Sequence, residues 1–241
     1  CRKLGLETKP ADLSVWQNVV DRLRNPHHTV TIGMVGKYVD YADSYKSLNE
    51  ALTHAGIHTD TKVVTKLIDS TKIEEEGTKL LEGLDAILVP GGFGKRGTEG
   101  MIKAIEYARE NKIPFLGICL GMQMAMVAFA RNVLGYADAN SSELDPETTH
   151  PVVDLMPDQN GVENLGGTLR LGSYPCVLDK KSKAYSLYGT DMINERHRHR
   201  FEINNDYRDD FTSHGMMLSG QSPDGHIVEM IELPDHPFYV G

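Results

Sequence analysis

Short apolar runs alternate with helical patterns along the chain from Thr29 to Asn132. The first run, Val30 to Val35, reads as a strand, and Tyr45 to Ala55 reads as a helix that ends at Gly56. The same alternation predicts further strands at 62–68, 85–89 and 115–118 and further helices at 73–81, 100–111 and 120–129. Unbroken apolar strands between helices predict right-handed βαβ units and a sheet covered on both faces. We therefore expect an α/β fold, a doubly wound and mostly parallel sheet with helices on both faces.

The pattern weakens after Asn132 and differs again in the first 29 residues. Residues 138–145 read as a loop. Strands are expected at 166–171 and 175–178, and later strands of mixed direction at 195–203 and 227–233. Near the start, Val15 to Arg24 predicts one short helix. We expect residues 1–29 to be an interdomain linker with this helix and residues 30–241 to form one domain. Because the chain opens on Cys1 and stops after an apolar run, we expect it to be part of a longer polypeptide whose C-terminal end is incomplete.

Composition narrows the class of protein. The 241 residues are 40% hydrophobic and 24% charged, as in a globular chain and unlike a disordered or collagen-like one. The 25 Lys and Arg residues against 34 Asp and Glu residues give a net charge of -9, so we expect no nucleic-acid partner and no membrane partner. No apolar run approaches the ~20 residues of a membrane span. Three scattered cysteines fit a reducing, cytoplasmic setting better than a disulfide framework or a zinc site.

The strongest chemical signal is the segment Gly117-Ile118-Cys119-Leu120-Gly121, where a predicted strand gives way to a predicted helix. A nucleophile between two glycines at such a turn is the G-x-nucleophile-x-G elbow, with Cys in place of Ser. The glycines allow a strained turn in which larger neighbours would collide. The helix N-terminus is expected to favour the thiolate of Cys119. The alternative is a small buried cysteine at a strand end. Met122, Met124 and Met126 of the following helix are expected to pack in the core.

A glycine-rich loop follows the strand at 85–89 and contains Gly92, Gly94 and Gly97 in the spacing G-x-G-x-x-G. A dinucleotide site would need an acidic residue at the end of the next strand, where this chain has Cys119. An oxyanion loop fits better, because adjacent glycines can turn backbone N–H groups toward a developing alkoxide beside the thiolate. For Gly97 and Gly100 a flexible surface turn is the alternative.

Three arginines alternate with two histidines between Glu195 and Glu202. On a strand the arginines, including Arg200, would share one face and the histidines the other. The arginine face can hold a carboxylate, whereas flanking cations disfavour a metal ion at the histidines, so we expect no metal site. A solvated charge run is the alternative. Glu143, in a polar loop, is by itself only an exposed carboxylate.

Together these motifs resemble the class I glutamine amidotransferases, which have a flavodoxin-like fold, and more narrowly the glutaminase domain of the CTP synthases. The resemblance covers nearly the whole chain from Val30 onward and rests on these segments: 33–38, 90–97, 115–123, 140–143, 166–172 and 195–202. The arginine–histidine run is the most specific of them.

The resemblance implies that L-glutamine is the substrate. Cys119 would attack the side-chain amide, release ammonia and leave a γ-glutamyl thioester that water hydrolyses. The residues that the resemblance places around the substrate are Gly92, Leu120, Gly121, Met122, Gln123, Glu143 and Arg200. The N–H groups of Gly92 and Leu120 would form the oxyanion hole, and Glu143 and Arg200 would hold the amino-acid end. A zwitterion needs one anion and one cation to anchor it, which fits the last pair.

The resemblance also implies a larger enzyme. Ammonia would pass to an amino-terminal synthetase domain, which would use ATP, Mg and UTP to make CTP, and the whole enzyme is expected to be a homo-oligomer. No cofactor is expected in the present domain. GTP would act as an effector, and Phe93 lies in the loop associated with that effect.

The sequence differs from the family pattern at one motif near its C-terminal end. The family completes its catalytic triad with a His-Pro-Glu motif, whereas His236-Pro237-Phe238 lacks the glutamate. We expect the triad His and Glu to follow Gly241. A chain without them would have little glutaminase activity.

Two alternatives remain open. One is another cysteine hydrolase of the same architecture, such as a γ-glutamyl hydrolase or a DJ-1-like protein. The other is a catalytically incomplete module that binds a ligand without turnover.

Overall fold

The computed structural model describes residues 2–5, 10–41, 43–155 and 169–241. Among these residues the α-helices are α1 (Ser14–Arg24), α2 (Lys46–His58), α3 (Ser70–Glu76), α4 (Thr98–Glu110), α5 (Leu120–Phe129), α6 (Lys183–Tyr188) and α7 (Arg208–Ser213). The strands are β1 (His28–Gly36), β2 (Thr61–Asp69), β3 (Ala86–Val89), β4 (Phe115–Gly117), β5 (Asn140–Ser141), β6 (Pro151–Leu155), β7 (Arg170–Leu178), β8 (Met192–His199), β9 (Phe201–Ile203), β10 (Met217–Gln221), β11 (Val228–Glu232) and β12 (Tyr239–Val240). Short 3₁₀ turns cover Arg2–Leu4, Thr78–Leu81 and Asn205–Tyr207, and a π-helical turn, Ala130–Leu134, extends α5.

The described strands form one large mixed sheet and one small sheet. The large sheet has the order β2-β1-β3-β4-β12-β11-β10-β7-β8, and the small one has the order β5-β6-β9. Neighbours from β2 to β12 are parallel, and neighbours from β12 to β8 are antiparallel. The parallel half follows the doubly wound order 2-1-3-4-5. The expected α/β architecture is confirmed, although only half of the large sheet is parallel.

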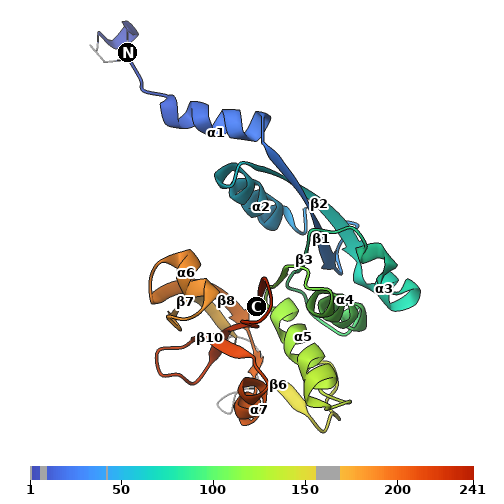
Figure 1. Cartoon of the computed structure of the whole chain (residues 1–241). Helices are drawn as coiled ribbons and strands as arrows, with labels where there is room; N and C mark the ends of the chain where they lie inside the picture. The colour runs from blue at the N-terminus through green and yellow to red at the C-terminus, as the bar shows by residue number, and fades with distance from the viewer. Residues whose placement is uncertain (1, 6–9, 42, 156–168) are drawn as a thin grey trace.

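Helices cover both faces of the parallel half, and the alternation along its strands shows why. On β1, Met34 joins a core cluster with Tyr45 and residues of α2, whereas the next residue, Val35, joins the main core with α4 and α5. On β3, Leu88 lies in the first cluster and Ile87 in the second. Successive side chains of a strand point to opposite faces, so unbroken apolar strands need cover on both sides. Figure 1 shows α4 and α5 beside these strands.

The parallel strands end together, and this sets the place of the site. Val89 of β3 pairs with Gly117 of β4, and Leu116 pairs with Val240 of β12. The loops that leave β3 and β4 therefore leave the sheet at the same edge. In doubly wound sheets, ligands bind at this carboxyl edge.

Several predicted boundaries differ from the structure for identifiable reasons. Gly56 does not end α2 but is buried within it, at a place where a side chain would collide with the carbonyl oxygen of Thr61. The helix predicted at 73–81 is two elements, α3 and a 3₁₀ turn, separated by Gly77 with φ 81°. The strand predicted at 166–171 lies partly outside the described residues, as does the motif segment 166–168; its described end belongs to β7.

The first helix, α1, lies at the margin of the fold, next to α2 (Figure 1). None of its residues is buried, and Trp16 is 68% exposed. Arg22 links the helix to the end of α2, because its guanidinium donates to the carbonyl oxygen of His58 at 3.0 Å. No helix among the described residues has the length and hydropathy needed to cross a bilayer.

Candidate active site

The turn between β4 and α5 has the strained geometry expected of a nucleophile elbow. Cys119 has φ 56° and ψ -108°, a region that side-chain-bearing residues rarely adopt. A side chain on Gly117 would lie 2.8 Å from the backbone carbon of Gly121, and one on Gly121 would collide with the carbonyl oxygen of Val89. The strand and the helix thus approach so closely that both flanking positions require glycine. The expected steric role of these glycines is confirmed.

The pKa of the Cys119 thiol is shifted in the direction opposite to the one expected. Its pKa is raised, first by burial and then by the negative charges of Glu202 and Glu143, and a backbone hydrogen bond from Leu120 offsets this only in part. The N–H group of Leu120 at the helix N-terminus favours the thiolate, as predicted, but burial and the two carboxylates outweigh it, so the net pKa of the thiol is raised. A thiolate at neutral pH needs a further base or cation beside the sulfur.

The glycine-rich loop after β3 lies against the elbow, as the pairing of β3 with β4 requires. A side chain on Gly91 would lie 3.3 Å from Cβ and 3.6 Å from Sγ of Cys119. On the other side of the loop, a side chain on Gly92 would contact Leu120, Lys37 and Tyr38 at 3.5–3.7 Å. The backbone of this loop can therefore face a group bound at Cys119, as the oxyanion-loop interpretation requires.

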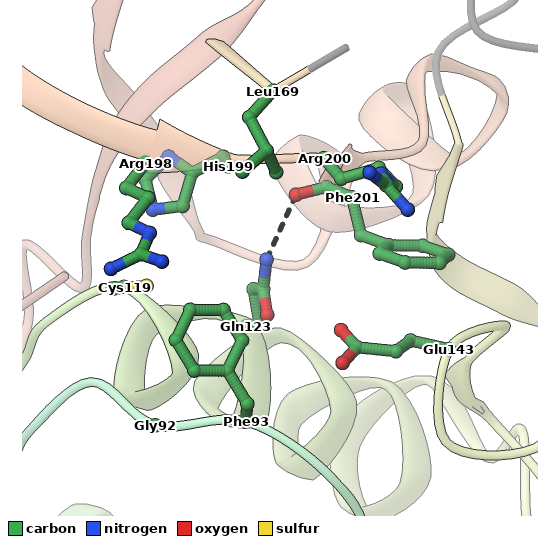
Figure 2. Close-up of a pocket in the computed structure, with 10 residues that line it drawn as sticks. All are labelled: Gly92, Phe93, Cys119, Gln123, Glu143, Leu169, Arg198, His199, Arg200 and Phe201. Atoms are coloured by element: carbon green, nitrogen blue, oxygen red, sulfur yellow. Dashed lines mark hydrogen bonds between the residues drawn. The ribbon is translucent and has the colours of Figure 1, made fainter. Parts of the chain in front are cut away.

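A pocket of about 220 Å³ opens at this point (Figure 2). The residues that line it are Gly92, Phe93, Cys119, Gln123, Glu143, Leu169, Arg198, His199, Arg200 and Phe201. Its volume lies below the ~300–1,000 Å³ typical of drug-sized ligands, which suits a ligand of amino-acid size. Of the sequence-predicted residues, the pocket brings together Gly92, Phe93, Cys119, Gln123, Glu143 and Arg200.

Two further predicted residues, Leu120 and Met122, lie in the core beneath the pocket and do not line it. Leu120 is 2% exposed and Met122 is 7% exposed, and both lie in the main core. Met124 and Met126 are fully buried, as expected. Gln123 contributes its side chain to the lining, and its Nε2 donates to the carbonyl oxygen of Phe201 at 2.9 Å (Figure 2).

Opposite charges face the pocket from the two ends of the small sheet. Glu143 lies in the turn directly after β5, and Arg200 lies at the bend directly before β9. Both strands pair with β6. Figure 2 shows the Glu143 carboxylate directed into the pocket below Arg200 and Phe201. A carboxylate and a guanidinium at one end of a small pocket match the ammonium and carboxylate of an amino acid.

The arginine–histidine run alternates as predicted, but only as far as β8 continues. Arg196 and Arg198 are exposed, whereas His197 and His199 face inward. Arg200 lies beyond the strand end, so its direction is set by the bend and not by the alternation. Arg198 also reaches the pocket, where its guanidinium lies 5.7 Å from the centre of the Phe93 ring.

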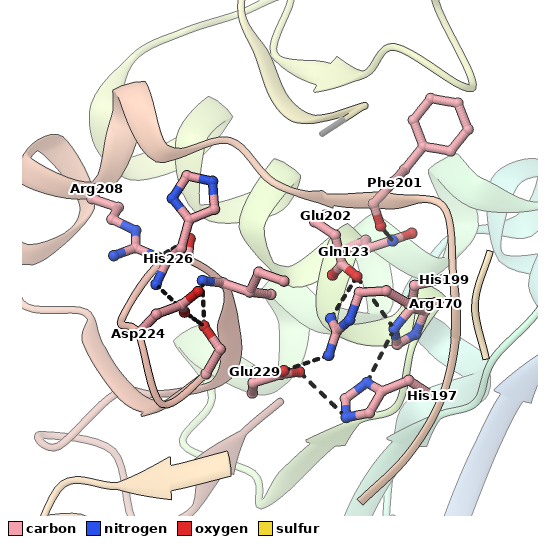
Figure 3. A network of polar contacts seen from close by, with 12 residues as sticks. Gln123, Arg170, His197, His199, Phe201, Glu202, Arg208, Asp224, His226 and Glu229 are labelled. Atoms are coloured by element: carbon pink, nitrogen blue, oxygen red, sulfur yellow. Dashed lines mark hydrogen bonds and ion pairs between the residues drawn. The ribbon is translucent and has the colours of Figure 1, made fainter. Parts of the chain in front are cut away.

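A buried ionic network lies behind the pocket (Figure 3). Arg170 donates to Glu202 at 2.7 Å and to Glu229 at 2.5 Å, and His197 lies 3.3 Å from Glu229. Burial raises the pKa of Glu202 to about 7 and lowers the pKa of His199 to about 4. The histidines are thus held in this network as neutral rings. No group of three potential metal ligands occurs among the residues that the structure describes.

Sequence reasoning missed Leu169, His199 and Phe201 as lining residues and Arg170 as the centre of the network. Arg170 follows a glycine pair and pairs across the hairpin with His199, but a cross-strand register is not visible in the sequence. His236 neither lines the pocket nor joins the ionic network. Its ring is buried and donates from Nε2 to the carbonyl oxygen of Ala108 at 3.1 Å.

Comparison with known protein families gives one match over most of the chain. The family glutamine amidotransferase class-I matches residues 40–241.

Individual proteins give the same picture. A CTP synthase of Carboxydothermus hydrogenoformans is 58% identical over 240 residues, which are 99% of this chain and 45% of that protein. A CTP synthase of Geotalea uraniireducens is 58% identical over 241 residues and is likewise covered over 45% of its length. A solved structure described as the Trypanosoma brucei CTPS glutaminase domain with bound acivicin is 36% identical, with a TM-score of 0.82 over 88% of this chain and 83% of that one. The present chain thus spans about 45% of the length of the curated relatives it matches.

Proposed function

This chain belongs to the class-I glutamine amidotransferase family, and on that premise we propose that its pocket hydrolyses the side-chain amide of L-glutamine. The single observation that carries the proposal is the pocket itself, which holds a strained cysteine at one end and an opposed carboxylate and guanidinium at the other. An amide carbonyl and an amino-acid end are the two groups that such a pocket recognises.

The proposed reaction has two steps. Sγ of Cys119 attacks the amide carbon, the carbon–nitrogen bond breaks, and ammonia leaves with the thiol proton as the γ-glutamyl thioester forms. Water then cleaves the thioester to glutamate and restores the thiol. The backbone N–H groups of Gly92 and Leu120 stabilise the oxyanion in both steps. Glu143 binds the ammonium of the substrate and Arg200 binds its carboxylate, while Gly121, Met122 and Gln123 shape the floor.

The proposed mechanism needs a base for Cys119, because the described surroundings raise the pKa of its thiol. His236 is directed toward Ala108 and away from this role. We propose that the base and its carboxylate partner follow Gly241 in the full-length protein. The register supports this, because β12 runs parallel to β4 with Val240 beside Leu116, so the chain direction at Gly241 points to the edge where Cys119 lies.

We further propose that the chain is the glutaminase part of a CTP synthase, with residues 1–29 as the interdomain linker and residues 30–241 as the glutaminase domain. Ammonia would pass to an amino-terminal synthetase part that uses ATP, Mg and UTP, in a cytoplasmic homo-oligomer under GTP control near Phe93. The support is the 58% identity to two CTP synthases over nearly the whole chain.

The test uses the full-length protein and two nitrogen donors. Cys119→Ala should abolish CTP formation from glutamine and leave CTP formation from ammonia intact, because only the first route needs the thiol. Loss of both activities, or retention of both, contradicts the assignment. A ligand-binding module without turnover would instead show no faster labelling of Cys119 than of Cys176 by a glutamine-like electrophile.

A further inference from the structure

Lys37 is a buried lysine directly after β1, and the reaction proposed above gives it no part. Its side chain is only 4% exposed. Its backbone N–H donates to the hydroxyl of Tyr45 at 3.1 Å, and so does the N–H of Tyr38 at 3.2 Å. The backbone of Lys37 is thereby fixed at the carboxyl edge of the sheet, beside the end of β3.

The side chain of Lys37 reaches the glycine-rich loop. Nζ donates to the carbonyl oxygen of Phe93 at 3.2 Å and also to that of Gly94. Its Cδ would lie 3.6 Å from a side chain placed on Gly92, so the aliphatic stem packs on that glycine. In the opposite direction, Arg96 of the loop donates from its guanidinium to the carbonyl oxygen of Lys37. The loop and the end of β1 are therefore joined by two cationic side chains, Lys37 donating to the loop and Arg96 donating back to the end of β1.

This loop needs such ties because of its composition. Gly91, Gly92 and Gly94 give the backbone many accessible conformations, and each residue held in one of them costs about 1–2 kcal/mol of conformational entropy. Residues 90–93 form no regular secondary structure. An oxyanion donor is effective only when it is aimed before the charge develops.

We propose that Lys37 is a positioning residue that fixes the Gly92–Gly94 turn against β1 and so aims the N–H of Gly92 at the oxyanion. The inference rests on the proposed glutaminase reaction. Lys37 does not touch the substrate: it acts through the two carbonyl oxygens that follow the donor N–H along the chain. A residue with only a packing role would need the aliphatic stem of Lys37 but not its ammonium.

The charged groups around Lys37 agree with this role. Burial and the neighbouring Arg96 lower its pKa to about 8, while Glu143 and Glu74 act in the opposite direction. The groups that face Lys37 are therefore Arg96 of the loop, Glu143 of the turn after β5, Glu74 of α3, and the hydroxyl of Tyr45. Lys37 is charged at neutral pH, and its grip on the loop should weaken as the pH rises through about 8.

The test compares Lys37→Met, which keeps the stem and removes the donors, with Lys37→Arg, which restores donors, in the full-length protein. Lys103→Met on α4 is the matched control, because Lys103 also donates to a backbone carbonyl, that of Glu74, but on the surface. Each variant is measured for glutamine hydrolysis, for ammonia-dependent CTP formation and for amide hydrogen exchange in residues 91–97.

We expect Lys37→Met to lower kcat for glutamine about 10- to 100-fold, short of the ~10²–10³-fold cost of losing an oxyanion donor outright. KM should change less than threefold, because Glu143 and Arg200 remain. Amide exchange in the loop should accelerate at least tenfold, and ammonia-dependent activity should be unaffected. Lys37→Arg should recover part of kcat, and Lys103→Met should behave as the wild type.

Either of two results overturns the inference: loop exchange in Lys37→Met equal to that of the wild type, or kcat within twofold of the wild type. Failure of the proposed function looks different, since Cys119→Ala would then retain glutamine hydrolysis. The exchange measurement decides the role of Lys37 in holding the loop in either case.

Discussion

Glu202 is buried in the network behind the pocket, and its replacement by glutamine gives a sharp test of the electrostatics of the site. Glu202 is 5% exposed and accepts a hydrogen bond from Arg170 at 2.7 Å (Figure 3). Burial nevertheless raises its pKa to about 7, the negative charge of Glu229 adds to the rise, and Arg170, which also binds Glu229, offsets it only in part. Glu202→Gln keeps the shape and removes the titrating proton.

The magnitude follows from the two pKa values. The carboxyl has an ordinary pKa of 4.5 when unfolded and a pKa of about 7 when folded, and at 1.36 kcal/mol per pKa unit the difference is about 3 kcal/mol. Between these values the folded chain binds a proton that the unfolded chain has released. This contribution to stability is therefore complete below pH 4.5 and is lost as the pH rises to about 7.

The assay is urea unfolding of the wild type and of Glu202→Gln at several pH values between 5 and 8. The free energy of unfolding of the variant relative to the wild type should rise with pH, by up to about 3 kcal/mol over the full titration. His199, 3.9 Å from Glu202, has its pKa lowered to about 4 and so remains neutral in the folded protein over this range. Glu110→Gln, at an exposed carboxylate on α4, controls for the loss of one charge.

A difference between Glu202→Gln and the wild type that does not change with pH, or that falls as the pH rises, would refute the reasoning. It would mean that Arg170 compensates Glu202 fully despite its second partner, Glu229.

Three further predictions follow from the geometry of the site. Gly121→Ala should lower the melting temperature, because the new methyl group meets the carbonyl of Val89 and overpacking costs about 1–3 kcal/mol; an unchanged melting temperature would contradict the close approach. Glu143→Gln and Arg200→Lys should each raise KM for glutamine at least tenfold with a smaller change in kcat, measured by steady-state glutaminase assays; an effect on kcat alone would exclude ground-state binding. In this 241-residue chain, alkylation of Cys119 by iodoacetamide should accelerate continuously from pH 7 to above pH 9, because the pKa of the thiol is raised; a rate that levels off below pH 7 would show a preformed thiolate.

The sequence was informative where a signal is local. The strand–Cys119–helix turn could be predicted because glycines at positions 117 and 121 serve contacts within a few residues along the chain. The alternation of strands and helices likewise predicted the parallel half of the sheet, since each βαβ unit is built from neighbouring segments. The loop after β3 was placed beside Cys119 by the same logic.

The rest depends on contacts between distant segments. Arg170, Glu202 and Glu229 come from β7, from β9 and from β11, and their meeting depends on strand pairings that no local pattern encodes. The raised pKa of Cys119 was not foreseen for the same reason, because burial by the folded chain is its largest cause and Glu202, which adds to it, lies 83 positions further along the chain. Arg200 was chosen through the family resemblance and lines the pocket, yet the alternation that was expected to orient it stops one residue earlier, at His199.

In the proposed reaction the two ends of a bound glutamine would be held by different sheets, and α5 would fix the distance between them. Cys119 and the glycine loop stand at the edge of the large sheet, whereas Glu143 and Arg200 flank strands of the small one. All ten residues of α5 are buried, and its Gln123 donates to Phe201, the first residue of β9. Because a buried helix and a strand do not shift by a methylene without loss of packing, this spacing is rigid. A substrate one methylene shorter, such as asparagine, would reach either the charged pair or the sulfur but not both, and so would lose the contacts at one of its ends. On the proposed mechanism, selectivity for substrate length would therefore reside in the packing of α5 between the two sheets rather than in the loops beside the amide.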